Sequence, residues 1–380
     1  MVKTESVLGR GVLMAAHCAG MIDLVTLPVW VGTLISSYRF DAQQAGALVT
    51  LFLAGAVVAS LFFAPRFHRL RGRMAAPLGY GLAALAFVLV SLTQDFALMA
   101  ALHALAGLAT GCGLSFTHGT IGRSANPHRL FALAGLALGV FAIAMLGGLP
   151  ALVAAVGGAA MFRVFALVMA VAAVLSALAF PTPHEAQAEA AGPGGRLSAA
   201  AWLVMAGVSC MALVQAMLFS FVERIGAERF GIQAVTSMLI ALGFVTLLPA
   251  PLAALLQKSL PPHRVLLAGP VAQALVAVGI AQSLLFAPYA VAAILLPCVM
   301  IFTHTFAFGA LARLDLTGRA VAATPAMTMV GAAVGPFLGG TLVKFGGYSP
   351  LALAACAVAT VAIGCFAAMP RFASPLPATP

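Results

Sequence analysis

The feature that most constrains this chain is a series of apolar runs, each about 20 residues long, that recurs along almost its whole length. A helix needs roughly 20 apolar residues to cross a bilayer. Hydrophobic residues make up 63% of the 380 residues and charged residues only 7%, too few charges to cover a soluble protein. The runs do not alternate between polar and apolar residues, as β-barrel strands do. The sequence therefore predicts an all-α integral membrane protein.

Twelve transmembrane helices are predicted from these runs. We expect them at 10–37, 42–64, 75–94, 96–122, 129–152, 160–180, 199–222, 232–256, 264–285, 287–311, 320–343 and 348–369. The longest polar stretch, 181–198, is rich in Pro and Gly and reads as a flexible linker. It divides an N-terminal six-helix bundle (1–180) from a C-terminal one (199–373), and a disordered tail follows at 374–380.

The net charge of +10 is explained by orientation in the membrane. If the N-terminus is cytoplasmic and the helices alternate, fourteen of the 19 Lys and Arg residues fall on the cytoplasmic side and five on the other. This satisfies the positive-inside rule with both termini in the cytoplasm. The first run contains His17 and Asp23 and is too long for a cleaved signal peptide. We therefore expect a multi-pass protein of a bacterial inner membrane and no nucleic-acid partner.

The two halves of the chain resemble each other. The pentapeptide RFDAQ at 39–43 corresponds to RFGIQ at 229–233, an offset of 190 residues. The segments 139–148 and 331–340 share three glycines at an offset of 192, and Asp23 corresponds to Gln215 at that same offset. These matches indicate a duplicated six-helix unit.

Several segments resemble the major facilitator superfamily. The loop PRFHRLRGR at 65–73 is similar to the family's signature between helices 2 and 3, although the usual acidic residue is absent. Segment 162–165 and the glycine-rich segment 331–340 also resemble family motifs. The resemblance implies two pseudo-symmetric six-helix bundles and a transporter. It further implies a conformational gate at the loop between helices 2 and 3, formed by Arg66, Arg69, Arg71, Gly72 and Arg73.

Asp23 is the acidic residue that the prediction places in the middle of a transmembrane helix. A carboxylate inside a membrane is costly, so its presence points to function. His103 stands where the family resemblance implies an Arg, and a His titrates near neutral pH. We expect Asp23 and His103 to couple transport to protons. The alternative for each is a structural hydrogen bond that holds helices together.

Other polar residues are candidates for the wall of a substrate cavity, namely Gln215, His304 and His17. His118 lies nearer the cytoplasmic end and is expected to be a gate or structural residue. The pairs Glu223-Arg224 and Glu228-Arg229 are expected to be solvated ion pairs at the outer mouth, with an external gate as the alternative.

Glycine spacing predicts close helix packing in the eleventh helix. Gly331, Gly335 and Gly339 recur at helical intervals, which leaves one face without side chains. Pro336 removes a backbone hydrogen bond and favours a kink there. Pro28 is expected to bend the first helix just after Asp23.

A copper transporter is the alternative interpretation. Thioether, thiolate and imidazole groups suit Cu(I), and the candidate ligands are Met14, His17, Cys18, Met21, Met300 and His304. Against this, Met and Cys are also ordinary apolar filler in cores. None of the six cysteines belongs to a CxxC motif.

The sequence as a whole predicts a secondary active transporter that moves a small organic solute by alternating access. We expect a monomer whose partners are the solute, protons and the bilayer, with no bound metal and no cofactor. An enzyme is disfavoured because no nucleophile, base and orienting acid gather near a membrane face.

Overall fold

The computed structural model describes residues 2–63, 66, 70–182, 197–314, 320 and 324–372, which are almost entirely helical. The helices are α1 (Val7–Gly20), α2 (Ile22–Ser36), α3 (Ala42–Phe63), α4 (Gly72–Val90), α5 (Phe96–Gly122), α6 (Pro127–Val156), α7 (Ala159–Ala179), α8 (Ala199–Phe230), α9 (Ile232–Val245), α10 (Pro249–Leu256), α11 (Pro262–Gln282), α12 (Phe286–Leu314), α14 (Thr324–Gly346) and α15 (Ser349–Phe372). Within these ranges, β pairing is limited to one bridge between Lys3 and Thr182.

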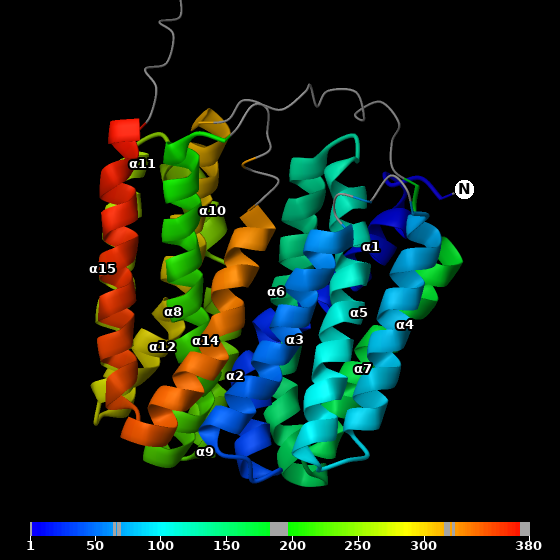
Figure 1. The fold of residues 1–380 in the computed structure, drawn as a ribbon, viewed down its shortest axis with the longest axis horizontal. Coiled ribbons are helices and arrows are strands. Elements are labelled where there is room, and N and C mark those ends of the chain that lie inside the picture. The colour runs from blue at the N-terminus through cyan, green and yellow to red at the C-terminus, as the bar shows by residue number, and fades with distance from the viewer. Residues whose placement is uncertain are drawn as a thin grey trace, which may run out of the picture.

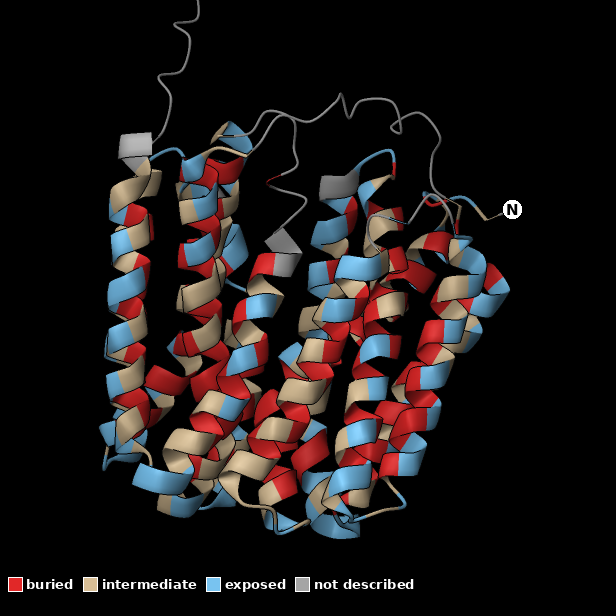
Figure 2. Ribbon diagram, viewed as in Figure 1, coloured by how far each residue is buried: buried red, intermediate tan, exposed pale blue. Residues whose placement is uncertain are grey.

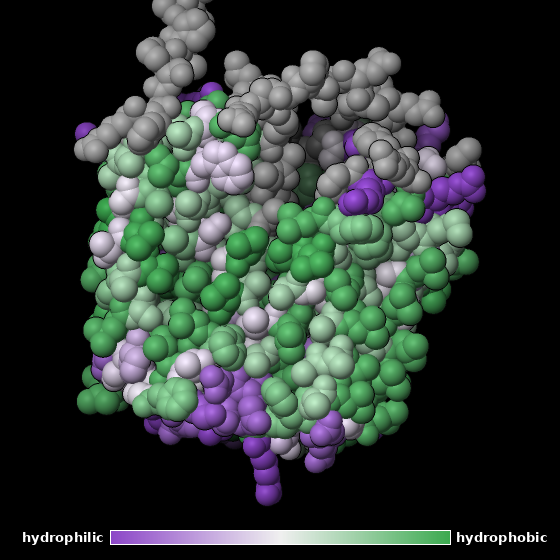
Figure 3. Space-filling model, in the orientation of Figure 1, coloured by the Kyte–Doolittle hydropathy of each residue, from purple (hydrophilic) through white to green (hydrophobic). Residues whose placement is uncertain are grey.

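Twelve stretches of the described chain are long and apolar enough to cross a membrane, as the sequence predicts. They stand side by side as a bundle (Figure 1). Apolar side chains cover its middle, and hydrophilic ones gather at its two ends (Figure 3). We name the end where α7 ends and α8 begins the linker end, and the opposite end, between α2 and α3, the Asp41 end. The bilayer dictates this architecture, because a helix satisfies its own backbone hydrogen bonds where no water is available.

The first span is not the continuous helix predicted over 10–37. It is interrupted at Met21, which separates α1 from α2 upstream of Asp23. Pro28 lies inside α2, and a bend there stays a prediction. The physical reason for the interruption lies in Asp23, which falls in the first turn of α2. Carboxylates are favoured in this position because the first N–H groups of a helix lack intrahelical acceptors.

The eighth span, predicted over 232–256, is also divided. A turn at 246–248 separates α9 from α10, and Pro249 begins α10. Proline suits the first turn of a helix because it has no N–H to leave unpaired.

Helices α1–α7 and α8–α15 form two groups, which we call the N-half and the C-half. They meet where α3 packs on α14, α2 on α8 and α6 on α9. In Figure 1 the two groups converge at the Asp41 end and stand apart at the linker end. Buried residues line the facing sides of the helices, while the outward faces are exposed (Figure 2).

Candidate functional site

Asp23 lies close to the middle of the first span, directly after the break between α1 and α2. Its carboxylate is beside the backbone N–H groups of Asp23 itself and of Leu24. No ion pair within 4.0 Å engages it among the described residues. Helix dipole and backbone groups thus surround the carboxylate, and no cation neutralises it.

His103 lies in α5 and is fully buried. Its Nδ1 atom is 2.7 Å from the carbonyl oxygen of Met99, which assigns the ring hydrogen to Nδ1 because a carbonyl only accepts. The ring packs on Trp30 and on Phe162, with both pairs of ring centroids 5.5 Å apart. No contact joins His103 to Asp23 in the described part of the chain. A shared role of the two in proton coupling stays a prediction.

Gln215 and His304, the predicted cavity residues of the C-half, both carry an unsatisfied polar atom. Gln215 in α8 is buried, and its Oε1 has no hydrogen-bond partner among the described residues. His304 in α12 stacks on Phe308 with ring centroids 4.8 Å apart, and its buried Nδ1 is also unpaired there. Buried polar groups normally have partners, so both side chains retain hydrogen-bonding capacity for a ligand.

His17, predicted to line the cavity, forms a pair with His118. Its Nδ1 lies 2.9 Å from Nε2 of His118, and the ring centroids are 5.1 Å apart. One imidazole donates and the other accepts, so one ring hydrogen occupies the bridge between the two neutral rings. The pair links α1 to α5 in the half of the membrane nearer the linker end. Both residues are candidates from the sequence, but they lie 101 residues apart in the chain, so only the fold shows that they pair.

The alternative copper ligands lie on two helices of different halves. Met14, His17 and Cys18 are on α1, whereas Met300 and His304 are on α12. Met300 packs in a hydrophobic core cluster of the C-half. Within the described residues, no group of three or more His, Cys, Asp or Glu side chains is arranged to hold a metal ion.

Helix α14 lies between α8 and α3 and packs closely on both. Gly331, Gly335 and Gly339 face α8, where a Cβ atom at Gly335 would come within 2.7 Å of the Met217 nitrogen. Pro336 lies on the side facing α3, where its carbonyl oxygen fills the space that a Cβ atom at Gly46 would need. Small residues therefore bring three helix backbones together.

The two halves are also joined by a group of polar side chains at the Asp41 end. We name Asp41, Gln43, Thr341 and Lys344 the polar latch. Lys344 Nζ lies 3.0 Å from Asp41 Oδ2 and donates to Gln43 Oε1 at 3.1 Å, and Gln43 Nε2 donates to Thr341 Oγ1 at 3.2 Å. At this end α3 and α14 also approach so closely that a Cβ atom at Gly340 would overlap the carbonyl oxygen of Ala42. The Asp41 end is therefore the closed end of this conformation.

Asp41 also begins α3, and both roles act on its charge. Its Oδ1 accepts from the Gln44 N–H at 2.8 Å, while Gln44 Oε1 accepts from the Asp41 N–H at 3.1 Å, a reciprocal capping box. Partial burial by itself would raise the pKa of Asp41. The Gln44 N–H and the Lys344 ammonium both stabilise the ionised carboxylate. Their combined effect is larger than that of burial, so the pKa of Asp41 is lowered.

We expect the latch ion pair to be independent of pH between 7.5 and 5. A carboxyl whose pKa is lowered by folding contributes stability above its unfolded pKa, and the contribution disappears only as the pH falls through the folded value. The pair is solvent-exposed, so Asp41→Asn should lower the free energy of unfolding by only about 0.2–1 kcal/mol. Thermal unfolding of the purified variant and parent at pH 7.5 and pH 5 measures this. A difference between them that changes with pH in this range would contradict the prediction.

The loop predicted to be a conformational gate is described only in part. Arg66 Nη1 donates to the Phe62 carbonyl at 2.7 Å, and its guanidinium lies 4.0 Å from the Phe62 ring centroid. Arg71 and Arg73 are exposed, and Gly72 lies against the Phe180 ring. Arg69 lies outside the described residues, as do the tail at 374–380 and most of the linker.

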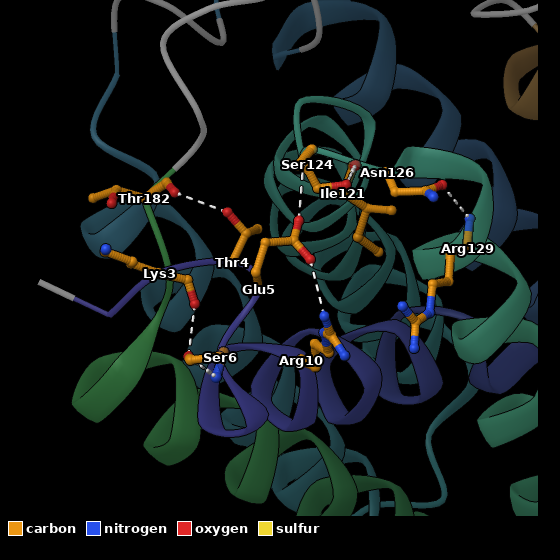
Figure 4. Close-up of polar contacts among 12 residues, drawn as sticks. Lys3, Thr4, Glu5, Ser6, Arg10, Ile121, Ser124, Asn126, Arg129 and Thr182 are labelled. Carbon is orange, nitrogen blue, oxygen red and sulfur yellow. Dashed lines mark hydrogen bonds and ion pairs between the residues drawn. The ribbon is translucent and has the colours of Figure 1, made fainter.

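The N-terminal residues are fastened to the N-half at the linker end (Figure 4). Glu5 accepts from the Ala125 N–H at 3.0 Å and pairs with Arg10 at 3.1 Å. Thr4 Oγ1 donates to the Thr182 carbonyl at 3.3 Å. These contacts hold the N-terminus, the turn between α5 and α6 and the start of the linker together, all within one half.

Comparison with known proteins assigns the family. A sequence profile described as Major Facilitator Superfamily matches residues 12–317. The chain belongs to the major facilitator superfamily. This superfamily consists of transporters rather than enzymes, so this member is a secondary transporter and a multi-pass membrane protein that binds a small-molecule substrate. The prediction of the fold and of a non-enzymatic protein is confirmed.

Solved structures within the superfamily agree with this fold. The structure of a point mutant of the nucleoside transporter NupG matches with a TM-score of 0.77 and covers 96% of this chain and 99% of NupG. A second NupG structure matches with a TM-score of 0.73 and covers 96% and 98% of the two chains. Both are 12% identical to this superfamily member, which shows a shared fold alone. No curated protein sequence matches the chain.

Glu223 is the residue whose position the sequence analysis described least well. It was expected to form a solvated ion pair with Arg224, but Arg224 pairs with Glu228 instead. Glu223 is partly buried and faces Gly32 of α2 in the other half. The sequence shows a carboxylate seven residues before the end of α8. It does not show that this carboxylate lies against Gly32, because that residue belongs to a helix far away in the chain.

Proposed function

We propose that this transporter couples a small organic solute to protons through Asp23, in a bacterial inner membrane with the linker end in the cytoplasm. The observation that carries the proposal is the position of Asp23. It is a carboxylate near the middle of the first span, at a helix break, with no cation within 4.0 Å in the described part of the chain. A carboxylate in such a place takes up and releases a proton more readily than one held in an ion pair.

The proposed orientation follows from charge. Fourteen of the 19 Lys and Arg residues fall on the linker-end side of the predicted spans, and the positive-inside rule assigns that side to the cytoplasm. The latch closes the other end. On this assignment the conformation is inward-facing, with its external end shut by α3, α14 and the polar latch.

The proposed mechanism is alternating access between this conformation and one open at the Asp41 end. Protonation of Asp23 removes a buried charge, which alters the relative free energy of the two conformations. The solute biases the same equilibrium through its differential affinity for the two conformations. The proton that Asp23 gains on one side and loses on the other accounts for coupling, and Gln215 and His304 offer unpaired hydrogen-bonding atoms to the solute.

Asp23→Asn should abolish proton-driven accumulation of the solute while sparing solute exchange, because Asn keeps the shape of the carboxyl group and cannot titrate. The measurement is uptake into proteoliposomes with an imposed proton gradient, followed by counterflow without a gradient. A thermal-shift screen at pH 5.5 and 7.5 first selects the solute. It covers organic acids, amino acids, sugars, nucleosides, hydrophobic cations and Cu(I), because a ligand at a hundred times its Kd stabilises a protein by roughly 2.7 kcal/mol.

Asp95→Asn is the matched control, because Asp95 caps the N-terminus of α5 in an exposed turn at the Asp41 end. That variant should accumulate the solute normally. Full concentrative uptake by Asp23→Asn would overturn the assignment. Stabilisation by Cu(I) that is lost on replacing His17, Cys18 and Met21 would replace it with the copper interpretation.

A further inference from the structure

Glu223 of α8 and Gly32 of α2 meet at the interface between the two halves. A Cβ atom at Gly32 would overlap the Oε2 atom of Glu223 and lie 2.8 Å from its carboxyl carbon. The carboxyl group therefore lies directly against the α2 backbone, in the space that a side chain at position 32 would use. Both residues lie toward the Asp41 end of their helices, on the closed side of the molecule.

Every cation near Glu223 is engaged elsewhere. Arg224 pairs with Glu228, which also accepts from the Tyr348 hydroxyl at 2.6 Å. Arg229 donates to three carbonyl oxygens at the end of α11, the shortest at 2.7 Å. Within the described residues, no hydrogen bond or ion pair within 4.0 Å engages Glu223.

The other groups that surround Glu223 carry little charge. Arg224 and Glu228 are the charged side chains that act on it, and their charges oppose each other. The Tyr289 hydroxyl of α12 is nearby but donates to the Val222 carbonyl. Helix α2 beyond Asp23 and the whole of α9 contain no titratable side chain, and Lys344 of α14 is held by the polar latch. An ionised Glu223 would therefore lack a compensating partner in the closed state.

We propose that Glu223 is a second proton-binding site, one that senses the pH at the Asp41 end and stabilises closure of that end when it is protonated. The inference rests on the alternating-access mechanism proposed above. Closure presses the carboxyl group against an apolar helix, where an unpaired charge is costly. Opening separates α8 from α2 and returns the group to water. Protonation and closure therefore favour each other by linkage.

The proton balance distinguishes this site from Asp23. In the open state the Glu223 carboxylate takes one proton from the aqueous phase at the Asp41 end and becomes a neutral carboxylic acid. On reopening, the same proton returns to the same phase. Glu223 thus adds no transported proton to the cycle and changes only the equilibrium between closed and open states. Acid at the Asp41 end shifts the population toward the closed state.

The test measures closure directly in the full-length protein in lipid nanodiscs. Spin labels at Leu92→Cys, in the turn between α4 and α5, and at Leu284→Cys, between α11 and α12, report the separation of the halves at the Asp41 end. Both positions are exposed, and the six native cysteines are replaced by Ala. Distance distributions from pH 5.5 to 8.5 give the closed-to-open ratio. One coupled proton predicts a ratio that falls with rising pH by up to about tenfold per pH unit.

Glu223→Gln should remain closed across this pH range, because a neutral amide replaces the protonated acid. The matched control is Asp95→Asn, an exposed carboxylate at the same end of the molecule that does not act on Glu223, and this variant should keep the parent pH profile. A parent ratio that does not vary with pH overturns the proposal, and this holds even if Glu223→Gln fails to fold. Retention of the pH profile by Glu223→Gln, or closure by Na⁺ at constant pH, overturns it as well.

The two proton sites fail independently. Asp23→Asn should lose accumulation yet retain the pH dependence of closure, whereas Glu223→Gln should retain the ratio of protons to solute. Loss of the pH dependence of closure in Asp23→Asn, with the pH profile retained in Glu223→Gln, rejects the role of Glu223 alone. A pH-dependent ratio with full accumulation in Asp23→Asn rejects the coupling role of Asp23 alone.

Discussion

Gly340→Leu should abolish transport and hold the Asp41 end open. A Cβ atom at Gly340 would overlap the carbonyl oxygen of Ala42 and lie 3.0 Å from Cα of Gln43. These nearest atoms all belong to α3, in the other half, so the overlap falls on the contact between the two halves. Overpacking of this kind costs about 1–3 kcal/mol, and it applies to the closed conformation alone. The open-to-closed ratio should therefore rise by roughly 5- to 150-fold.

The reciprocal substitution strengthens this test. At Gly46 of α3, the nearest atoms to a Cβ belong to Pro336 and Phe337 of α14, so Gly46→Leu should have the same effect from the opposite half. Gly148→Leu on α6 and Gly364→Leu on α15 are matched controls, because no heavy atom lies within 4 Å of a Cβ at either position. The Leu92–Leu284 label distance and solute uptake are the measurements. An unchanged distance in Gly340→Leu, or an equal change in the controls, would reject the close approach of α3 and α14 as the closing contact.

Trp30→Ala should destabilise the N-half strongly. Trp30 is fully buried in α2 and packs on Phe52 of α3, Phe87 of α4 and Phe165 of α7, with ring centroids 4.9–5.8 Å apart. It also contacts His103 of α5, so one side chain ties five helices together. Truncation of a buried Trp to Ala costs about 3–5 kcal/mol through lost contacts and the cavity that remains.

Trp202→Ala provides the matched control, because Trp202 is the other tryptophan of the chain and is 58% exposed on α8. Its removal should change the free energy of unfolding by no more than about 0.5 kcal/mol. Denaturation of both purified variants in the same detergent measures the difference. Equal losses would show that the aromatic cluster does not hold the N-half together.

The sequence determined the number of spans and the family. Apolar runs of this length are long enough to cross a bilayer as helices. Inside the bilayer each backbone N–H and C=O group needs a hydrogen-bond partner within its own segment, and a helix provides one. Hydropathy alone therefore predicted the twelve spans that the structure contains. The glycine pattern in the eleventh helix likewise marked α14 before its neighbours α8 and α3 were known. These are local properties, which depend on residues close together in the chain.

The break at Met21 was less predictable. A proline was the evident signal for a bend, yet the helix divides before Asp23, where a carboxylate meets the free N–H groups at the start of α2. Pro28 lacks an N–H and predicts a bend, whereas Asp23 favours the first turn of a helix, and the interruption lies next to Asp23. The sequence identified Asp23 as a candidate, and the fold showed that its partly buried carboxylate lies at the start of a helix.

Only the tertiary structure decided which residues meet across the two halves. Lys344 lies 301 residues from Gln43 along the chain, and the pair exists because α14 lies against α3. The same holds for Glu223 and Gly32, which meet between α8 and α2. Hydropathy alone indicates only a charged residue near the end of one helix and a glycine within another. Hydropathy fixes how deep a residue lies in the membrane, because depth depends on its own helix. Its neighbours depend on how the helices rotate and pack, and this is settled by the combined contacts of the whole bundle.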